Sequence, residues 1–369
     1  MFWNASDIKD HRKFPERVMH SASPAFHFKD GKSSGTFEKI LQKAEYKYRG
    51  DRRLRDWTEF LESTGTTSFI VIKDDAIIYE NYLNGYHRDS INLSFSVAKS
   101  FTSALVGIAI DERHIKSVDD PVTKYLPELK KRFEKITIRH LLSMNSGIRY
   151  RDGDFPGRDE PLVYYYPKLR KLSLNLTKFE ATPGEYFHYN NYHPLLLGVV
   201  LERTTGMSVT KWTEEKLWKP LGMEFPGSWS IDSIEGGLEK MGSSLNARSI
   251  DFAKFGKLFL QKGNWDGKRI LSEEWVIEST TRDRSMERGN YYRTLKAFST
   301  RPDLYYKYFW WGYSNSGNDY DFMAIGHLGQ YIYVSPAANV VIVRNGKKEG
   351  KVDFWPDMFR EMASKLRGA

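Results

Sequence analysis

The sequence contains no cysteine among its 369 residues. Disulfide bonds, thiolate metal sites and a cysteine nucleophile are therefore excluded. Long apolar runs are missing as well: Ala104–Ile110 and Pro194–Leu201 are among the longest, well short of the roughly 18 residues that a membrane span needs. The sequence thus predicts no membrane span.

The first residues, Met1–Arg12, are charged and contain no apolar stretch, so no signal peptide is visible. We expect a cytoplasmic protein if the chain is complete, and a periplasmic or secreted one if a signal peptide has been removed. The absence of cysteine does not decide between these compartments, since proteins of both can lack it.

Basic residues exceed acidic ones, 56 against 47, which gives a net charge of +9. The two signs alternate along almost the whole chain, a pattern that favours a solvated basic surface over a nucleic-acid site. Aromatic residues make up 15% of the sequence, which excludes a disordered chain. We expect a globular protein that does not bind nucleic acid, and the sequence leaves its oligomeric state open.

Strand signals occur early and late in the chain. Thr67–Lys73 and Ala76–Tyr82 predict one hairpin, and Gln330–Val334 and Val340–Arg344 predict a second. Helical spacing of apolar residues recurs elsewhere. The segments with this spacing are Thr36–Ser63, Ser96–Asp111, Ile136–Met144, Leu195–Thr205, Ala247–Gln261 and Asp357–Arg367.

This order predicts a mixed α/β fold, with an antiparallel sheet flanked by helices, built from both chain ends, and an inserted all-helical domain. We expect an N-terminal arm at 1–35, the sheet domain at 36–110 and 245–369, and the helical domain at 111–244. An active site would lie in the cleft between the two domains.

A serine three residues before a lysine occurs three times, at Ser6–Lys9, Ser96–Lys99 and Ser208–Lys211. On a helix this spacing places both side chains on one face. A serine hydroxyl needs a base to take its proton, and a lysine can act as that base if its pKa is lowered. The pair could therefore form a covalent nucleophile and its base.

Context separates the three pairs. Ser6 lies in the irregular arm and Ser208 in a polar run, whereas Ser96 opens a predicted buried helix. Lys99 would then sit on an otherwise uncharged helix. The structural alternative, an N-cap serine and a lysine extending to the surface, is less favoured.

A second element is Tyr-x-Asn, which offers a phenol to relay protons and an amide to hold a carbonyl. Four tyrosines begin this string, and only Tyr189 precedes a predicted buried helix within a turn-rich loop. Tyr189 and Asn191 are therefore the candidates, because loop residues held by a rigid helix suit catalysis.

Three motifs follow one another in the chain. They are Ser96–Lys99, then Pro183-Gly184-Glu185 with Tyr189–Asn191, then Gly326-His327-Leu328-Gly329-Gln330-Tyr331 at the start of a strand. With this order the chain resembles the serine β-lactamase/penicillin-recognising superfamily, in its branch of class C-like esterases, DD-peptidases and 6-aminohexanoate-dimer hydrolases. The resemblance runs from about Thr67 to Arg344.

The resemblance implies roles for these residues. Ser96 would be the acyl-accepting nucleophile, Lys99 its general base, Tyr189 the proton relay to the leaving group, and Asn191 an orienting group. The oxyanion hole would use the Ser96 N–H and one N–H of the third motif.

The third motif departs from the Lys-Thr-Gly or His-Thr-Gly of the relatives. In one register His327-Leu328-Gly329 is the match and Gln330 supplies the N–H. In the other, which we favour, Gly326 fills the glycine position and His327 supplies the N–H. In both registers the lysine that helps hold a β-lactam carboxylate is missing, and Arg149, Arg151 or Arg158 could substitute for it.

The sequence shows no P-loop, no H-E-x-x-H and no dinucleotide-binding glycine pattern, so we expect no metal and no cofactor. It favours a serine hydrolase that cleaves linear amides or short esters of small-molecule substrates through an acyl-enzyme. The alternatives are a β-lactamase or DD-peptidase, and a catalytically silent penicillin-binding-like protein.

Overall fold

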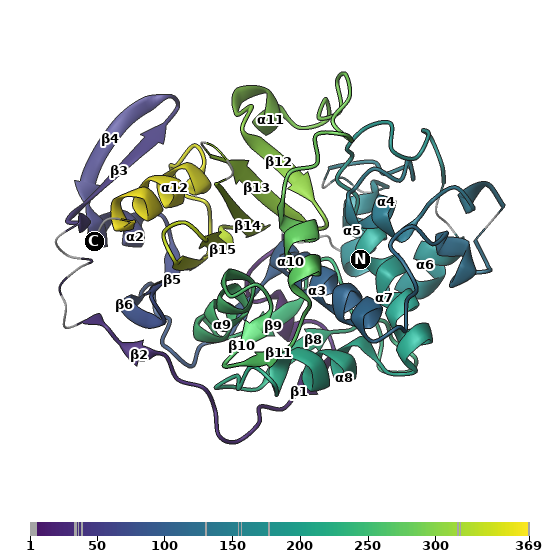
Figure 1. Ribbon diagram of the computed structural model, residues 1–369, viewed down its shortest axis with the longest axis horizontal. Helices are drawn as coiled ribbons and strands as arrows, with labels where there is room; N and C mark the ends of the chain where they lie inside the picture. Colours follow the sequence, from purple (N-terminus) through teal and green to yellow (C-terminus); the bar gives the residue numbers. More distant parts are fainter. Residues whose placement is uncertain are drawn as a thin grey trace.

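The computed structural model describes residues 6–32, 35, 37, 40–129, 131–153, 155, 157–175, 178–315, 317 and 319–367. Strands from both chain ends meet in one sheet (Figure 1). Within the described residues this sheet has eight strands in the order β12-β13-β14-β15-β16-β5-β6-β2, antiparallel except for the β2–β6 pair. Its strands are β2 (Lys29–Asp30), β5 (Thr66–Lys73), β6 (Ala76–Tyr82), β12 (Leu304–Lys307), β13 (Trp310–Ser314), β14 (Tyr320–Gly326), β15 (Gln330–Ser335) and β16 (Val340–Gly346).

Both predicted hairpins form, and they join each other. β16 pairs with β5, so that Val343 lies opposite Ile70. Helices cover the sheet on both faces, which explains why β5, β15 and β16 are buried almost throughout. The expected mixed α/β fold, with a sheet built from both chain ends, is confirmed.

Alternate residues of β15 face different helices, as the two-residue period of a strand requires. The ring of Tyr333 packs against Phe359 of α12 (Trp355–Leu366), with their centroids 5.7 Å apart. Ile332 points to the other face, where α9 (Ser249–Leu260) lies. A glycine of α9, Gly256, allows this close approach.

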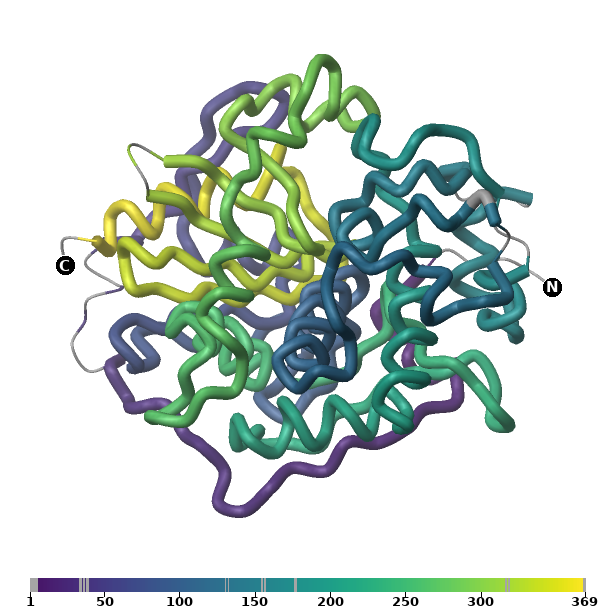
Figure 2. The backbone as a smooth tube through the Cα atoms, turned by 45° about the vertical axis from the view of Figure 1, so that its right-hand side comes forward, coloured from purple at the N-terminus to yellow at the C-terminus, as the bar shows by residue number. Residues whose placement is uncertain are grey.

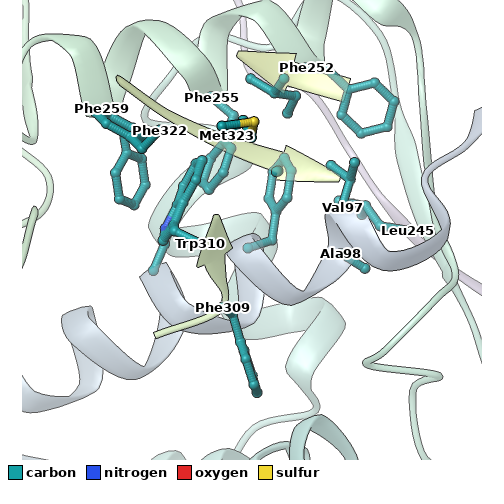
Figure 3. Close-up of a cluster of buried hydrophobic side chains, with 14 of the residues drawn as sticks. Val97, Ala98, Leu245, Phe252, Phe255, Phe259, Phe309, Trp310, Phe322 and Met323 are labelled. Atoms are coloured by element: carbon teal, nitrogen blue, oxygen red, sulfur yellow. The ribbon is translucent and has the colours of Figure 1, made fainter. Parts of the chain in front are cut away.

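An aromatic cluster joins α9 to the helix that carries Lys99 (Figure 3). The rings of Phe255 in α9 and Phe101 in α3 (Ala98–Asp111) stack with centroids 3.6 Å apart, and Trp310 lies parallel to Phe255 at 5.9 Å. Buried aromatic pairs of this kind each contribute about 0.5–1.5 kcal/mol beyond the area they bury. The cluster therefore fixes α3 against the sheet.

The described part of the chain between α3 and β9 is mainly helical and lies beside the sheet (Figure 2). No helix in the described ranges is long and apolar enough to cross a membrane. The α-helices not yet named are α2 (Trp57–Ser63), α4 (Ile138–Leu142), α5 (Asp159–Tyr165), α6 (Leu169–Asn175), α7 (Tyr192–Thr205), α8 (Val209–Thr213), α10 (Glu273–Thr280) and α11 (Lys296–Thr300). Shorter turns are η1 (Asp10–Arg12), η3 (Phe95–Val97), η4 (Val122–Lys124), η5 (Lys131–Phe133) and the π-helical η6 (Glu214–Trp218).

A second sheet, which the sequence did not predict, has the order β1-β8-β9-β7. Its strands are β1 (Glu16–Met19), β8 (Gly227–Ser230), β9 (Leu245–Ala247) and β7 (Asn92–Leu93). The segment expected as an arm at 1–35 thus contributes β1 to this sheet and β2 to the main one, and in Figure 2 it runs along the lower side of the molecule. The domain boundaries at 110/111 and 244/245 remain a prediction.

The helical reading of Thr36–Ser63 is confirmed for residues 57–63 but wrong for residues 43–56. These form a hairpin of β3 (Lys43–Tyr48) and β4 (Asp51–Asp56), followed by α2. Arg49 and Gly50 adopt positive φ angles of 54° and 85°, as a tight turn between twisted strands requires. The side chain of Asp56 then caps α2 by accepting from two backbone N–H groups. A further short hairpin consists of β10 (Asn264–Trp265) and β11 (Lys268–Arg269).

The helix–sheet contact at Gly256 gives a stability prediction. An added Cβ would lie 2.5 Å from Cγ1 of Val341, a stiff β-branched side chain on a central strand. We expect Gly256→Ala to lower the free energy of unfolding by about 1–3 kcal/mol, because overpacking outweighs the helix propensity gained.

The matched control is Gly198→Ala in α7. There the added Cβ meets Cγ of Met241 at 2.6 Å, and this flexible side chain can move. Chemical denaturation of both variants should show the smaller loss for Gly198→Ala, and equal losses would contradict the assigned contact.

Candidate active site

Ser96 lies in η3, the turn that leads into α3. The preceding residue, Phe95, has a φ of 43°, a left-handed conformation that costs a non-glycine residue about 1–3 kcal/mol. Ser94 holds this turn in place, because its N–H donates to Leu245 O and its side-chain oxygen accepts from Leu245 N. The strained turn leaves Ser96 half-buried on the wall of a pocket.

Lys99 lies one helical turn after Ser96, as the spacing predicts. Its Nζ donates to Ser96 Oγ at 2.8 Å and to the carbonyl of Gly242 at 2.7 Å. The residue is only 1% exposed, and burial lowers the pKa of Lys99 to about 7, an effect that the charge of Glu160 partly opposes. The amine is therefore close to half neutral at neutral pH, which is the state in which it can accept a proton.

Tyr189 lies beside this pair. Lys99 Nζ is 4.9 Å from the centroid of its ring, and the Tyr189 hydroxyl hydrogen-bonds the Ser96 side chain. Burial raises the pKa of Tyr189, and the bond to Ser96 lowers it by less. Trp311 and Tyr306 hold the ring from two sides, with centroids 6.2 and 6.1 Å away. The structure thus brings Ser96, Lys99 and Tyr189 together.

Asn191 belongs to the same site and is held by two residues that the sequence analysis missed. Its Nδ2 donates to Glu160 Oε2 at 2.8 Å and to the hydroxyl of Tyr150 at 3.0 Å, and that hydroxyl in turn donates to Glu160. Asn191 Oδ1 has no hydrogen-bond partner within the described part of the protein. The amide is therefore oriented by Glu160, with its oxygen left for another partner.

The third motif forms the β14–β15 turn. Gly326 is the last residue of β14, and an added Cβ there would lie 2.4 Å from Ser94 O and 3.2 Å from Ser96 N. Only glycine allows this approach of the strand to the backbone of Ser94 and Ser96. The motif and Ser96 are thus neighbours in space.

The two registers of the motif place different residues at the pocket. His327 follows Gly326, is exposed and lines the same pocket as Ser96. Gln330 is 1% exposed, pairs with Gly326 across the turn, and donates from Nε2 to the carbonyls of Gly346 and His327. The side chain of Gln330 thus braces the turn from inside.

The pocket in front of Ser96 has a volume of about 530 Å³. Aromatic and aliphatic side chains form most of its wall, together with one carboxylate and one lysine. The lining residues are Ser6, Phe95, Ser96, Glu160, Pro161, Val163, Tyr164, Tyr165, Asn191, Leu195, Lys240, Gly242, Ser243, His327 and Leu328.

The arginines considered as substitutes for the missing third-motif lysine do not line this pocket. Arg151 is paired with Asp159 at 3.1 Å, and together with Arg149 it borders a separate cavity of about 100 Å³. Lys240, which the sequence analysis did not consider, lies in the wall instead. Among the residues that the structure describes, no group of three or more His, Asp or Glu is placed to hold a metal ion.

Solved structures share this architecture. A Bacillus anthracis protein described as a candidate 6-aminohexanoate-dimer hydrolase superposes with a TM-score of 0.83 at 22% identity, over 98% of this chain and 93% of that one. A D-stereospecific amidohydrolase from Streptomyces sp. superposes with a TM-score of 0.60 at 18% identity, over 85% of this chain and 96% of that one. The fold is therefore that of the β-lactamase-like proteins.

Sequence comparison defines the family. The Beta-lactamase profile matches residues 58–366, and the chain belongs to this family. The 6-aminohexanoate-dimer hydrolase of Paenarthrobacter ureafaciens is 28% identical over 317 residues, which are 83% of this chain and 76% of the relative. The resemblance inferred from the motifs is confirmed.

The burial of Lys99 gives a prediction on stability. Its pKa is lower in the folded protein than in the unfolded chain, so the unfolded chain binds more protons between about pH 7 and 10.5. Burial of this lysine therefore lowers the free energy of unfolding by the largest amount below pH 7. The loss becomes smaller as pH rises from 7 to 10.5. We expect the melting temperature of Lys99→Met, relative to the original protein, to be highest near pH 6 and to fall toward pH 9.5.

Lys268→Met, at an exposed position in β11, is the control and should show no such trend. Calorimetry of the three proteins at pH 6, 7.5 and 9.5 measures the effect. A Lys99→Met difference that does not change with pH would contradict the lowered pKa.

Proposed function

We propose that this protein is a serine hydrolase that cleaves ester or amide bonds through an acyl-enzyme. The observation that carries the proposal is the 2.8 Å contact between Lys99 Nζ and Ser96 Oγ, in which the lysine has a pKa of about 7. A serine joined to a base that is partly neutral at physiological pH is an activated nucleophile. Ser96 borders a pocket large enough for a small-molecule substrate.

In the proposed first step, neutral Lys99 takes the proton of Ser96 Oγ while the oxygen attacks the substrate carbonyl. The electron pair of the carbonyl moves to its oxygen, which the N–H groups of Ser96 and His327 stabilise. When the intermediate collapses, the bond to the leaving group breaks and the proton reaches that group through the Tyr189 hydroxyl. Water, activated by the same residues, then hydrolyses the acyl-Ser96 ester.

The choice of His327 rests on the position of Gly326. Because a Cβ on Gly326 would nearly touch Ser96 N, the peptide that follows Gly326 lies next to the nucleophile's own N–H. In the alternative register the N–H of Gln330 would serve instead, from the strand that pairs with Gly326 across the turn. Asn191, whose amide is held by Glu160 and Tyr150, would act as the orienting group.

Linear amides and short esters are the proposed substrates. The name of the Paenarthrobacter relative refers to a linear amide, the dimer of 6-aminohexanoate. The turn at Gly326–Gln330 carries no lysine that could hold the carboxylate of a β-lactam. A β-lactamase or DD-peptidase is the second candidate, because the family and the serine–lysine pair are shared with such enzymes.

Replacement of the nucleophile tests the proposal. Ser96→Ala should reduce the hydrolysis of p-nitrophenyl butyrate by several orders of magnitude, because no acyl-enzyme can form. Ser208→Ala removes the serine of a Ser-x-x-Lys pair that does not line the pocket and serves as the control. Mass spectrometry after fluorophosphonate treatment should find the label on Ser96; a label on another serine, or no label and no hydrolysis, would refute the proposal.

The same preparation separates the substrate classes. kcat/KM is compared for p-nitrophenyl butyrate, a linear amide and nitrocefin. If nitrocefin is hydrolysed at least tenfold faster than both others, the antibiotic-hydrolase function replaces the proposed one.

Tyr189→Phe tests the proton relay. A p-nitrophenolate leaves without protonation, whereas an amine must gain a proton before it departs. We expect kcat/KM for the linear amide to fall at least tenfold more than kcat/KM for the p-nitrophenyl ester. Tyr306→Phe, which removes a hydroxyl from the neighbouring ring, is the matched control. Equal losses on ester and amide would contradict the role of Tyr189.

A further inference from the structure

Lys240 is a second buried lysine in the wall of the active-site pocket, and the proposed mechanism does not use it. Its side chain is 1% exposed, and its Nζ donates a hydrogen bond to the backbone carbonyl of Tyr164. The ring of Phe14 lies 4.1 Å from this nitrogen, measured to the centroid, and the ring of Tyr164 lies 5.9 Å away. Among the described residues, no carboxylate oxygen lies within ion-pair distance of it.

The turn that carries Lys240 also holds the catalytic pair. The carbonyl of Lys240 accepts from the N–H groups of Ser243 and Ser244, and this turn presents Gly242 O to Lys99 Nζ. Lys240 and the amine of Lys99 are thus fixed to the same short backbone segment. A group bound at Lys240 would have a defined position relative to Ser96.

A buried ammonium group that faces only a carbonyl and aromatic rings is costly, because the lost hydration is not replaced by a counter-ion. Lys99 also lacks a counter-ion, but two other buried lysines have one: Lys257 lies 2.9 Å from Asp75, and Lys254 lies 3.5 Å from Asp251. Lys240 differs from them in lining a pocket open to ligands. A bound anion would supply the missing charge.

We propose that Lys240 binds a carboxylate of the substrate and thereby selects linear esters and amides that carry an acidic group. This inference rests on the proposed hydrolase function. The apolar wall formed by Val163, Tyr164 and Leu195 suits the hydrocarbon chain between that carboxylate and the bond that is cleaved.

The other charges around the pocket are consistent with this assignment. Glu160 also lines the pocket, but its carboxylate already accepts from Tyr150 and Asn191. Burial lowers the pKa of Lys240 to about 8, and the charge of Asp232 partly opposes this. Lys240 is therefore still mainly protonated at neutral pH.

Flexible and rigid substrates would use this cation differently. Lys240 lies on the turn after Glu239, and not on the β14–β15 turn where relatives carry their lysine. A flexible chain can bring its carboxylate to either place, whereas a fused β-lactam holds its carboxylate at a fixed position next to the reacting carbonyl. The location of Lys240 thus agrees with linear substrates.

Two pairs of esters test the proposal. In the first pair, mono-p-nitrophenyl glutarate carries a carboxylate on the acyl side, and p-nitrophenyl butyrate does not. In the second pair, 4-(butyryloxy)benzoate carries it on the leaving group, and its methyl ester is neutral. We expect kcat/KM to be higher for the charged ester than for the neutral ester in one pair. Lys240→Gln should reduce this charged-to-neutral ratio of kcat/KM values roughly ten- to a hundredfold, as for loss of a charge-assisted contact. Lys240→Arg should keep most of the preference.

Lys257→Gln is the control, since it removes a buried lysine outside the pocket and should leave the ratio unchanged. A preference that is absent in both pairs, or that Lys240→Gln does not reduce, would overturn the role of Lys240. By contrast, failure of the original protein to hydrolyse any of the four esters, or hydrolysis that survives Ser96→Ala, would overturn the hydrolase function itself.

A measurement on the unmodified protein covers the case in which Lys240→Gln does not fold. Both esters of a pair depend equally on Ser96 and Lys99, so those requirements cancel in the ratio of kcat/KM values. As pH rises through about 8, Lys240 loses its proton and the ratio should fall. Asp232 is the charged group that acts on Lys240, and the titratable residues Glu160 and Tyr164 line the same pocket. A ratio that stays constant from pH 6 to 9.5 would contradict the proposal.

Discussion

The site depends on one constraint: the amine of Lys99 is buried with only neutral groups as direct partners. A carboxylate in contact with it would keep the amine protonated and unable to accept a proton. The structure provides instead the carbonyl of Gly242 and the hydroxyl of Ser96. Glu160 acts from farther away and raises the pKa of Lys99 by less than burial lowers it.

Much of the surrounding structure serves to keep water away from that amine. Residues 98 to 109 of α3 are all buried, because α9 and the sheet cover one side of the helix and α7 covers another. Close contacts at Gly256 and Gly326 bring strands and helices nearer than a side chain would allow. The low pKa of Lys99 is thus a property of the packing and not of a single neighbour.

Features that depend on local sequence could be predicted. The Ser96–Lys99 pair follows from helical spacing, and the hairpins β5–β6 and β15–β16 follow from runs of β-branched, aromatic and other apolar residues next to turn formers. The family motifs supplied Tyr189 and Asn191, and the structure places both beside Ser96. The hairpin β3–β4 was missed because a few apolar residues at helical spacing concealed its strong turn at Arg49-Gly50.

Features that depend on distant parts of the chain could not be predicted. Glu160 and Lys240 reach the pocket from segments whose sequences carry no motif, and only the fold brings them to Ser96. The sheet that includes β1 and β8 joins residues more than 200 positions apart, such as Arg17 and Trp229. No periodicity within either segment indicates such a partner.

The pairing of β16 with β5 has a consequence for how the protein is made. A ribosome adds roughly 5 to 20 residues per second, so β5 and β6 wait on the order of ten seconds or more before β16 is synthesised. During that time their apolar faces lack their partners, and such unpaired strands are prone to aggregate. Ser96 and Lys99 are also made early, but the turn that borders them at Gly326 is made near the end. The surroundings of Ser96 therefore stay incomplete in the nascent chain until almost the whole protein has been synthesised.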